Sequence, residues 1–190
     1  MNDELLVRPS RDGDIAAIAA IYGHHVLHGI ASFEEVPPTV GEMARRRGDI
    51  LARGFPYLVA ERPSGRSNGT NDGKVVGYCY AGPYRARVGY RFSVEDSIYI
   101  DPAATGRGIG RALLAAVIDD VTLQGYRQMI AVIGGSETLP SIRLHAALGF
   151  KQIGVFPAIG FKFGRWIDSV YMQRALGPGG SGPPQEIAHG

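Results

Sequence analysis

Three closely spaced glycines, Gly106, Gly108 and Gly110, separate an apolar strand pattern from an apolar helix pattern near the middle of the chain. The first turn of a helix leaves backbone N–H groups unpaired, and the helix dipole adds a partial positive charge there. Glycine lets the main chain approach a ligand closely, and the neighbouring Arg107 and Arg111 add charge, so this turn is a candidate phosphate site. The plainer interpretation is a tight turn in which Gly110 packs on a sheet.

Two well-known phosphate-binding motifs do not fit this turn. A nucleoside triphosphatase needs Gly-Lys-Ser/Thr at the start of the helix, where this chain has Gly-Arg-Ala. A dinucleotide-binding fold places its glycines after the first strand of a βαβ unit. Here the turn follows residue 100 and several candidate antiparallel strands, so that fold is a poor match.

Hydrophobic periodicity predicts strands that surround a few crossover helices, which is typical of an α/β or α+β protein with a mixed sheet. The predicted strands are Leu5–Arg8, Tyr57–Glu61, Lys74–Tyr80, Ser93–Ile100, Gln128–Ile133, Phe150–Val155 and Ser169–Arg174. The predicted helices are Ile15–Val26, a segment capped by Thr39 and Glu42 that runs to about Arg53, the run ALLAAVIDDVTLQ after Gly110, and Ser141–Leu148.

The length of 190 residues suits one domain, which we place at residues 1–176. The last 14 residues, 177–190, contain five glycines and three prolines, so we expect a disordered tail outside the domain. A second polar stretch, Pro63–Gly73, has no apolar residue to anchor it, and it connects the two arms of a predicted long hairpin.

Charge and hydropathy exclude several classes of partner. The formal net charge is only +2, so no large positive field is available to hold a nucleic acid. No apolar run reaches the roughly 20 residues of a membrane-spanning helix, and no signal peptide is recognisable. The single cysteine, Cys79, cannot form an internal disulfide and is expected to be a buried thiol. We therefore expect a cytoplasmic protein.

The segment from Ser97 to Phe150 resembles the GNAT-type N-acetyltransferases, in which a strand, a Gly-x-Gly turn, a helix, a buried strand and a short helix ending in Leu-Gly-Phe follow one another. The chain is most similar to the branch of phosphinothricin and methionine sulfoximine acetyltransferases. Segments that carry this likeness, spread over about residues 5 to 176, include 82–87, Tyr90, 94–95, 98–100, 131–133, 143–145, 147–149 and 160–166.

The resemblance implies a mixed, mostly antiparallel, twisted sheet of about seven strands flanked by about four helices. It implies acetyl-CoA as the co-substrate, Glu95 as general base and His145 as a proton donor to the thiolate. Taken alone, Glu95 could be an exposed or ion-paired strand carboxylate, and His145 could be a helix histidine bonded to a neighbouring carbonyl. A base of this kind is typically worth ~10²–10⁴ in rate.

The resemblance also implies which residues bind the two substrates. The coenzyme is expected to contact the backbone of Ile98, Tyr99 and Ile100, the turn formed by Thr105, Gly106, Arg107, Gly108, Ile109, Gly110 and Arg111, and Thr138. At two of these positions the chain departs from the family, which has Gln/Arg in place of Thr105 and Asn in place of Thr138. The carboxylate of a small amino acid is expected to contact Arg85, Arg87 and Tyr90, with Ser97 beside the base; a solvated basic loop is the alternative.

The branch implies a homodimer, with the apolar hairpin Gly160–Trp166 as a plausible contact. Two rival functions stay open. One is a GNAT enzyme for another amine, such as a protein N-terminus or a polyamine, and the other is a non-catalytic acyl-CoA-binding module. A metal site is not expected, because His24, His25 and His28 have no third ligand in sequence and no HExxH frame.

Overall fold

A computed structural model describes residues 5–63, 73–185 and 187. Seven strands form one open sheet in the order β1-β2-β3-β4-β5-β7-β6, and four α-helices flank it. All neighbouring strands are antiparallel except β4 and β5. The predicted fold class is confirmed. The strands are β1 (Leu6–Pro9), β2 (Tyr57–Arg62), β3 (Lys74–Pro83), β4 (Ser93–Ile100), β5 (Gln128–Gly134), β6 (Lys151–Lys162) and β7 (Arg165–Ala175).

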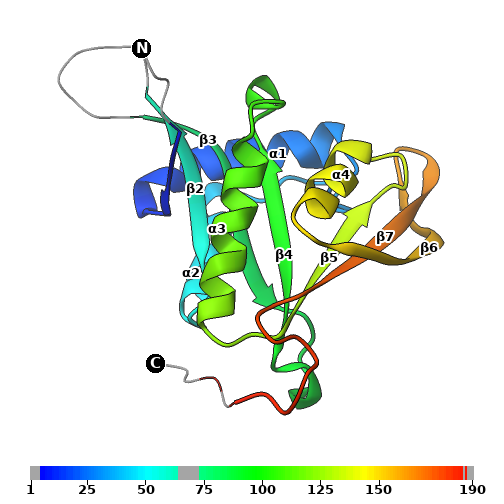
Figure 1. Ribbon diagram of the computed structural model, residues 1–190. Helices are drawn as coiled ribbons and strands as arrows, with labels where there is room; N and C mark the ends of the chain where they lie inside the picture. Colours follow the sequence, from blue (N-terminus) through cyan, green and yellow to red (C-terminus); the bar gives the residue numbers. More distant parts are fainter. Residues whose placement is uncertain (1–4, 64–72, 186, 188–190) are drawn as a thin grey trace.

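The helices cover the two faces of the sheet separately (Figure 1). Helices α1 (Ile15–His28) and α2 (Val40–Leu51) cover one face, and α3 (Ile109–Leu123) and α4 (Leu139–Ala147) cover the other. Helix α2 begins as the sequence predicts, because the Thr39 hydroxyl accepts a hydrogen bond from the Glu42 amide at 3.1 Å. None of the helices in the described part of the chain is both long and apolar enough to cross a bilayer.

Strands β4 and β5 pair over three residues only, from Ser93–Gln128 to Glu95–Ile130. Beyond Glu95, β4 continues beside β3 and β5 continues beside β7, so the two strands move apart (Figure 1). This opening lies beside α4 and the start of α3. Residues 96–100 of β4 therefore have no strand partner on their β5 side.

Strands β6 and β7 are longer than the sequence predicts. The missed part contains Gly154, Pro157 and Gly160, which weaken a strand pattern. In the structure this segment is irregular, with register shifts at Gln152/Gly154 and Phe156/Gly160. A two-residue turn at Phe163–Gly164, with φ angles of 51° and 72°, joins the strands, and such positive φ values at both positions match the right-handed twist of a hairpin.

Two predicted surface segments are described only in part. Of the polar connection Pro63–Gly73, residues 64–72 lie outside the described residues. In the predicted tail, Arg127 Nε donates a hydrogen bond to Gly179 O at 2.8 Å and Arg127 Nη2 donates one to Ser181 O at 3.1 Å. The beginning of the tail thus contacts the domain, and residues 186 and 188–190 lie outside the description.

The loop after α1 crosses the end of β5 at close range. A Cβ atom built on Gly134 would fall on the carbonyl oxygen of Ile30, and it would also lie 3.4 Å from the Phe33 ring. Because the nearest atom belongs to the main chain, it cannot rotate away. Gly134 therefore permits the loop to lie against the opening between β4 and β5.

We predict that Gly134→Ala lowers the free energy of unfolding by about 1–3 kcal/mol, because the methyl group displaces the main chain at Ile30. Gly154→Ala is the matched control, since a Cβ on Gly154 in β6 has no atom within 4 Å. Urea denaturation of both variants measures the difference. Equal stability of the two variants would contradict the close approach.

Candidate functional site

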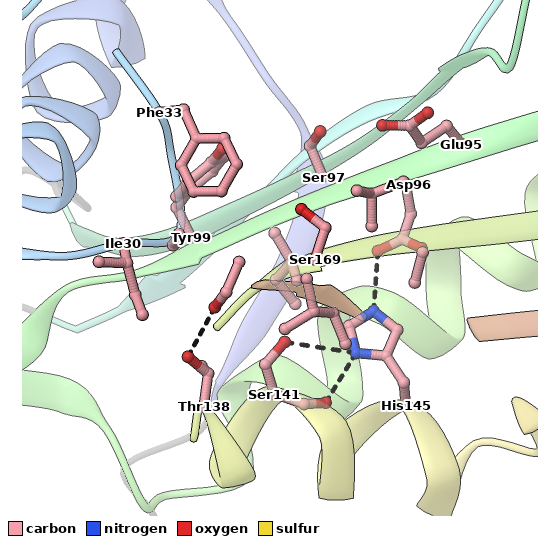
Figure 2. A pocket seen from close by; sticks show the side chains of 16 residues that line it. Ile30, Phe33, Glu95, Asp96, Ser97, Tyr99, Thr138, Ser141, His145 and Ser169 are labelled. Carbon is pink, nitrogen blue, oxygen red and sulfur yellow. Dashed lines mark hydrogen bonds and ion pairs between the residues drawn. The ribbon is translucent and has the colours of Figure 1, made fainter. Parts of the chain in front are cut away.

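A cavity of about 200 Å³ lies where β4 and β5 separate. Its walls come from β4, β5, the start of α4, the loop after α1 and the middle of β7 (Figure 2). The polar residues of the lining are Glu95, Asp96, Ser97, Thr138, Ser141, His145 and Ser169. Of the residues predicted from sequence, the cavity brings together Glu95, Ser97, Ile98, Tyr99, Thr138 and His145.

Successive residues of β4 point to opposite sides of the sheet, as a strand requires (Figure 2). Asp96 is buried on the side covered by α4, where it contacts His145. Glu95 extends to the other side, where the helices are α1 and α2. Two adjacent carboxyl groups therefore flank the opening, one on each face of the sheet.

Glu95 is half-buried, and its surroundings favour the protonated carboxyl. Burial, followed by the negative charge of Asp96, raises the pKa of Glu95 to about 7, and the positive charge of Arg85 opposes this rise. A carboxyl group with a pKa near neutrality exchanges protons at physiological pH. This is the property that a general base needs, because catalytic efficiency is greatest when the pKa lies near the operating pH.

His145 is almost fully buried on the other side of β4. Its Nδ1 donates a hydrogen bond to Ser141 O at 2.7 Å, and its Nε2 lies 3.0 Å from Asp96 Oδ2 (Figure 2). Burial lowers the pKa of His145. The hydrogen bond to Asp96, the charge of Asp96 and the bond to Ser141 raise this pKa by more than burial lowers it, so the net shift of the pKa is upward. Both ring nitrogens are therefore occupied, and the charged imidazolium is favoured.

The glycine-rich turn joins β4 to α3 through left-handed backbone. Gly106 and Gly108 have φ angles of 75° and 77°, and a Cβ at either position would meet no atom within 4 Å. Gly108 is the N-cap of α3, so the first amides of that helix open onto exposed space. Gly110 has a packing role instead, because a Cβ there would lie 3.1 Å from Leu144 Cδ2.

Comparison with known proteins identifies the family of this chain. The model of the Acetyltransferase (GNAT) family matches residues 27–150, which include β4, the turn, α3, β5 and α4. The chain belongs to the GNAT acetyltransferase family.

Several relatives are similar over nearly the whole chain. A phosphinothricin N-acetyltransferase from Alcaligenes faecalis is 52% identical over 94% of this chain and 86% of its own length. An L-methionine sulfoximine/L-methionine sulfone acetyltransferase from Salmonella typhimurium is 38% identical over 90% of this chain and 95% of its own length. The crystal structure of a GNAT superfamily phosphinothricin acetyltransferase from Sinorhizobium meliloti in complex with acetyl-CoA has a TM-score of 0.87 and 47% identity, and it covers 96% of this chain and 94% of its own.

The two positions that depart from the GNAT pattern use their side chains within the fold. Thr105 Oγ1 donates a hydrogen bond to Pro102 O at 3.2 Å, and Thr138 Oγ1 donates one to Gly134 O at 2.7 Å. Thr138 is the N-cap of α4. Both hydroxyl groups therefore donate their hydrogen atom within the fold rather than to a ligand.

The predicted carboxylate-binding residues do not line the cavity that contains Glu95. Arg85 and Arg87 line a separate cavity of about 700 Å³ together with Arg53 and Arg91. Tyr90 is partly exposed and packs edge-to-face on Tyr84, with ring centroids 5.6 Å apart. Arg85 links the two regions, because its positive charge opposes the rise in the pKa of Glu95.

Helix α1 contributes one histidine to the site region. His25 Nε2 lies 2.9 Å from Ile100 O and so donates a hydrogen bond to the end of β4. Burial lowers the pKa of His25, and the bond to Ile100 opposes this change. His24 and His28 stack on each other with ring centroids 4.8 Å apart. Among the described residues, no group of three His, Cys, Asp or Glu is arranged to hold a metal ion.

Sequence reasoning missed the residues that close the cavity on the side of α1. Phe33, from the loop after α1, lines the cavity, and the buried Lys162 holds that loop. Lys162 Nζ donates hydrogen bonds to Gly29 O at 2.9 Å and Ser32 O at 2.7 Å. The only signal in the sequence was the Gly-Phe-Lys-Phe-Gly segment, whose lysine stands inside an apolar hairpin.

Proposed function

We propose that this chain transfers the acetyl group of acetyl-CoA to the free amine of a small amino acid of the phosphinothricin, methionine sulfoximine or methionine sulfone type. The names of the relatives from Alcaligenes faecalis and Salmonella typhimurium support the acceptor, and the Sinorhizobium meliloti complex supports the coenzyme. The observation that carries the proposal is Glu95, a carboxyl group with a pKa of about 7 on the wall of the cavity between β4 and β5.

The open strand edge and the glycine-rich turn fit acetyl-CoA. The pyrophosphate would lie at the first amides of α3, where Gly106 and Gly108 leave the backbone accessible and Arg107 and Arg111 supply positive charge. The pantetheine arm would lie along residues 98–100, which lack a strand partner on the β5 side. Acetyl-CoA supplies an acetyl group activated as a thioester.

The residues around the cavity account for the movement of protons in a direct transfer. Glu95 accepts a proton from the substrate ammonium, either directly or through a water molecule, and so frees the amine lone pair. A C–N bond then forms as the C–S bond breaks, and the departing thiolate takes up one proton. Backbone N–H groups of Ile98–Ile100 stabilise the thioester oxygen as negative charge develops there. His145 places a buried positive charge on the cavity wall and is the proposed source of the proton. To deliver that proton, one of its N–H groups must leave Ser141 O or Asp96 Oδ2, to which both are bonded in this structure.

The proposed acceptor lies on the Glu95 side of β4. Ser97 shares that side, and the loop with Arg85, Arg87 and Tyr90 begins next to the same end of the sheet. Arg85 is the arginine whose charge reaches Glu95, so we assign it the carboxylate or phosphinate of the acceptor. Arg87 and Tyr90 would need to approach the cavity when substrate binds.

We predict that Glu95→Gln lowers kcat at least tenfold, because general-base catalysis is typically worth ~10²–10⁴ in rate. Acetyl-CoA binding should be unchanged, since Glu95 faces the acceptor side. In the wild type, kcat should rise with pH through about 7, because only the deprotonated Glu95 accepts a proton. Free-thiol release measures kcat, and calorimetry measures coenzyme binding.

Asp119→Asn, on the exposed side of α3, is the control for loss of a carboxylate and should leave kcat unchanged. Unchanged turnover in Glu95→Gln would refute the base assignment. A large loss of acetyl-CoA affinity would assign Glu95 to coenzyme binding instead.

A panel of amines tests the acceptor. We expect thiol release with phosphinothricin, methionine sulfoximine and methionine sulfone at a kcat/KM at least tenfold above that for a polyamine or a peptide. Arg85→Ala should raise KM for the amino acids more than it lowers kcat, because it removes a binding contact. A preference for the polyamine or the peptide would indicate another GNAT acceptor. Coenzyme-dependent thermal stabilisation without thiol release from any amine would indicate a binding module.

We propose that the chain forms a homodimer through the outer face of the β6–β7 hairpin. The hairpin exposes many large apolar side chains for a protein surface. They are Ile153, Val155, Phe156, Ile159, Phe161, Phe163 and Trp166, and the register places Phe161 and Trp166 on one face, which is the face meant here. Phe161 and Trp166 pack edge-to-face across the two strands, so the face is ordered. We also propose a cytoplasmic location, which suits the buried free thiol of Cys79.

We predict that Trp166→Glu converts the dimer to a monomer, because it buries an unpaired charge in the apolar hairpin face. Leu123→Glu is the control, since Leu123 is 89% exposed at the end of α3, away from the hairpin. Sedimentation velocity measures both variants against the wild type. A monomeric wild type, or a dimer in Trp166→Glu, would contradict this interface.

A further inference from the structure

Asp96 is a buried carboxyl group at the cavity that neither the sequence analysis nor the proposed mechanism uses. It is 7% exposed, and it lies on the cavity wall next to Glu95 in the chain. One of its oxygens, Oδ2, lies 3.0 Å from His145 Nε2. The other, Oδ1, is buried and has no hydrogen-bond partner. Because a buried carboxylate is costly unless it is paired, the contact with His145 must offset its desolvation.

The contacts of His145 fix the protonation of the ring. Nδ1 carries a hydrogen atom, because it bonds to the carbonyl oxygen of Ser141 at 2.7 Å. Nε2 faces a carboxylate, so a second hydrogen atom on the ring completes both bonds. The edge of the ring contacts Phe150, with centroids 5.0 Å apart. The ring is thus held in one orientation with acceptors at both nitrogens.

Asp96 also acts on the opposite face of β4. Its charge is the second cause, after burial, of the raised pKa of Glu95, and Arg85 opposes it from the loop before β4. The other titratable groups nearby belong to β3. Tyr80 interacts with Glu95, and burial together with the charge of Asp96 raises the pKa of the Cys79 thiol, which keeps that thiol neutral.

We propose that Asp96 is a positioning residue for acetyl transfer: its buried carboxylate, bonded to His145 on one face of β4 and adjacent in the strand to Glu95, orients His145 and couples it to Glu95. This inference rests on the proposed function. The negative charge of Asp96 keeps a proton on His145, the proposed acid, and increases the proton affinity of Glu95, the proposed base. The two groups of opposite role are thus matched to the same range of pH through a single side chain.

The pH dependence of kcat in Asp96→Asn tests the proposal. Loss of the charge lowers the pKa of Glu95 and of His145, so the acidic and alkaline limbs should both move to lower pH, and kcat on the alkaline limb should fall below that of the wild type at the same pH. Asp14→Asn is the matched control, because Asp14 is also 7% exposed and paired, with Arg8, outside the cavity. Asp14→Asn should leave both limbs in place. A uniform loss in Asp96→Asn with unmoved limbs would mean a purely structural role and would overturn the proposal.

The ionisation of His145 provides a second test that needs no turnover. NMR of the full chain labelled with ¹⁵N-histidine follows its five histidines, and His145→Gln identifies the signal of His145. We expect His145 to stay doubly protonated to a higher pH in the wild type than in Asp96→Asn, because the Asp96 charge raises the pKa of His145. A wild-type His145 that loses its second proton at or below the ordinary histidine pKa of 6.5 would overturn the proposal, even if Asp96→Asn fails to fold. If no amino acid is acetylated, the proposed function fails, and the NMR titration still decides whether Asp96 controls His145.

Discussion

The separation of β4 from β5 is the constraint on which the site depends. Parallel pairing holds these strands together for three residue pairs, whereas antiparallel pairing holds β4 to β3 over seven pairs and β5 to β7 over seven. The longer ladders on either side direct the two strands apart, because a parallel ladder is slightly weaker per residue. The result is a partly exposed strand edge at residues 96–100, which has no strand partner on the β5 side. Elsewhere an open strand edge would be a liability, but in the proposed reaction its backbone groups would form hydrogen bonds to an extended ligand.

The same strand separates the charges of the site. The two-residue period of a strand sends Glu95 to the face covered by α1 and α2, and Asp96 to the face covered by α4. Charges interact strongly across this short distance because both groups are withdrawn from water. Asp96 pairs with the cation of His145, so its own burial is offset, while Glu95 has no such partner and its pKa rises to about 7. Two adjacent carboxyl groups in one strand thus differ in their surroundings: Asp96 is paired with His145 of α4, and Glu95 takes up a proton more readily on the opposite face.

Local patterns predicted the parts of the fold in which sequence neighbours determine structure. The cap at Thr39, the apolar period of α3 and the glycine turn before it all depend on contacts within a few residues. Contacts between distant segments were not predictable in this way. The pair Asp96–His145 joins residues 49 apart, and Lys162 reaches Gly29 across 133 residues. The separate position of Arg85 and Arg87 also depends on how a whole loop folds back, and loop residues carry no periodic pattern that would indicate it.

The β6–β7 hairpin connects the proposed assembly to the acceptor side of the cavity. Its outer face is the apolar surface proposed to bind a second copy, and Lys162 at its tip holds the loop that carries Phe33 into the cavity. Lys162 also stands at the C-terminal end of α1, where the partial negative charge of the helix favours a cation. In the proposed dimer, burial of the outer face would restrict the hairpin, and the loop held by Lys162 would lose less entropy when an acceptor binds. The cavity and the proposed dimer would then be coupled through Lys162.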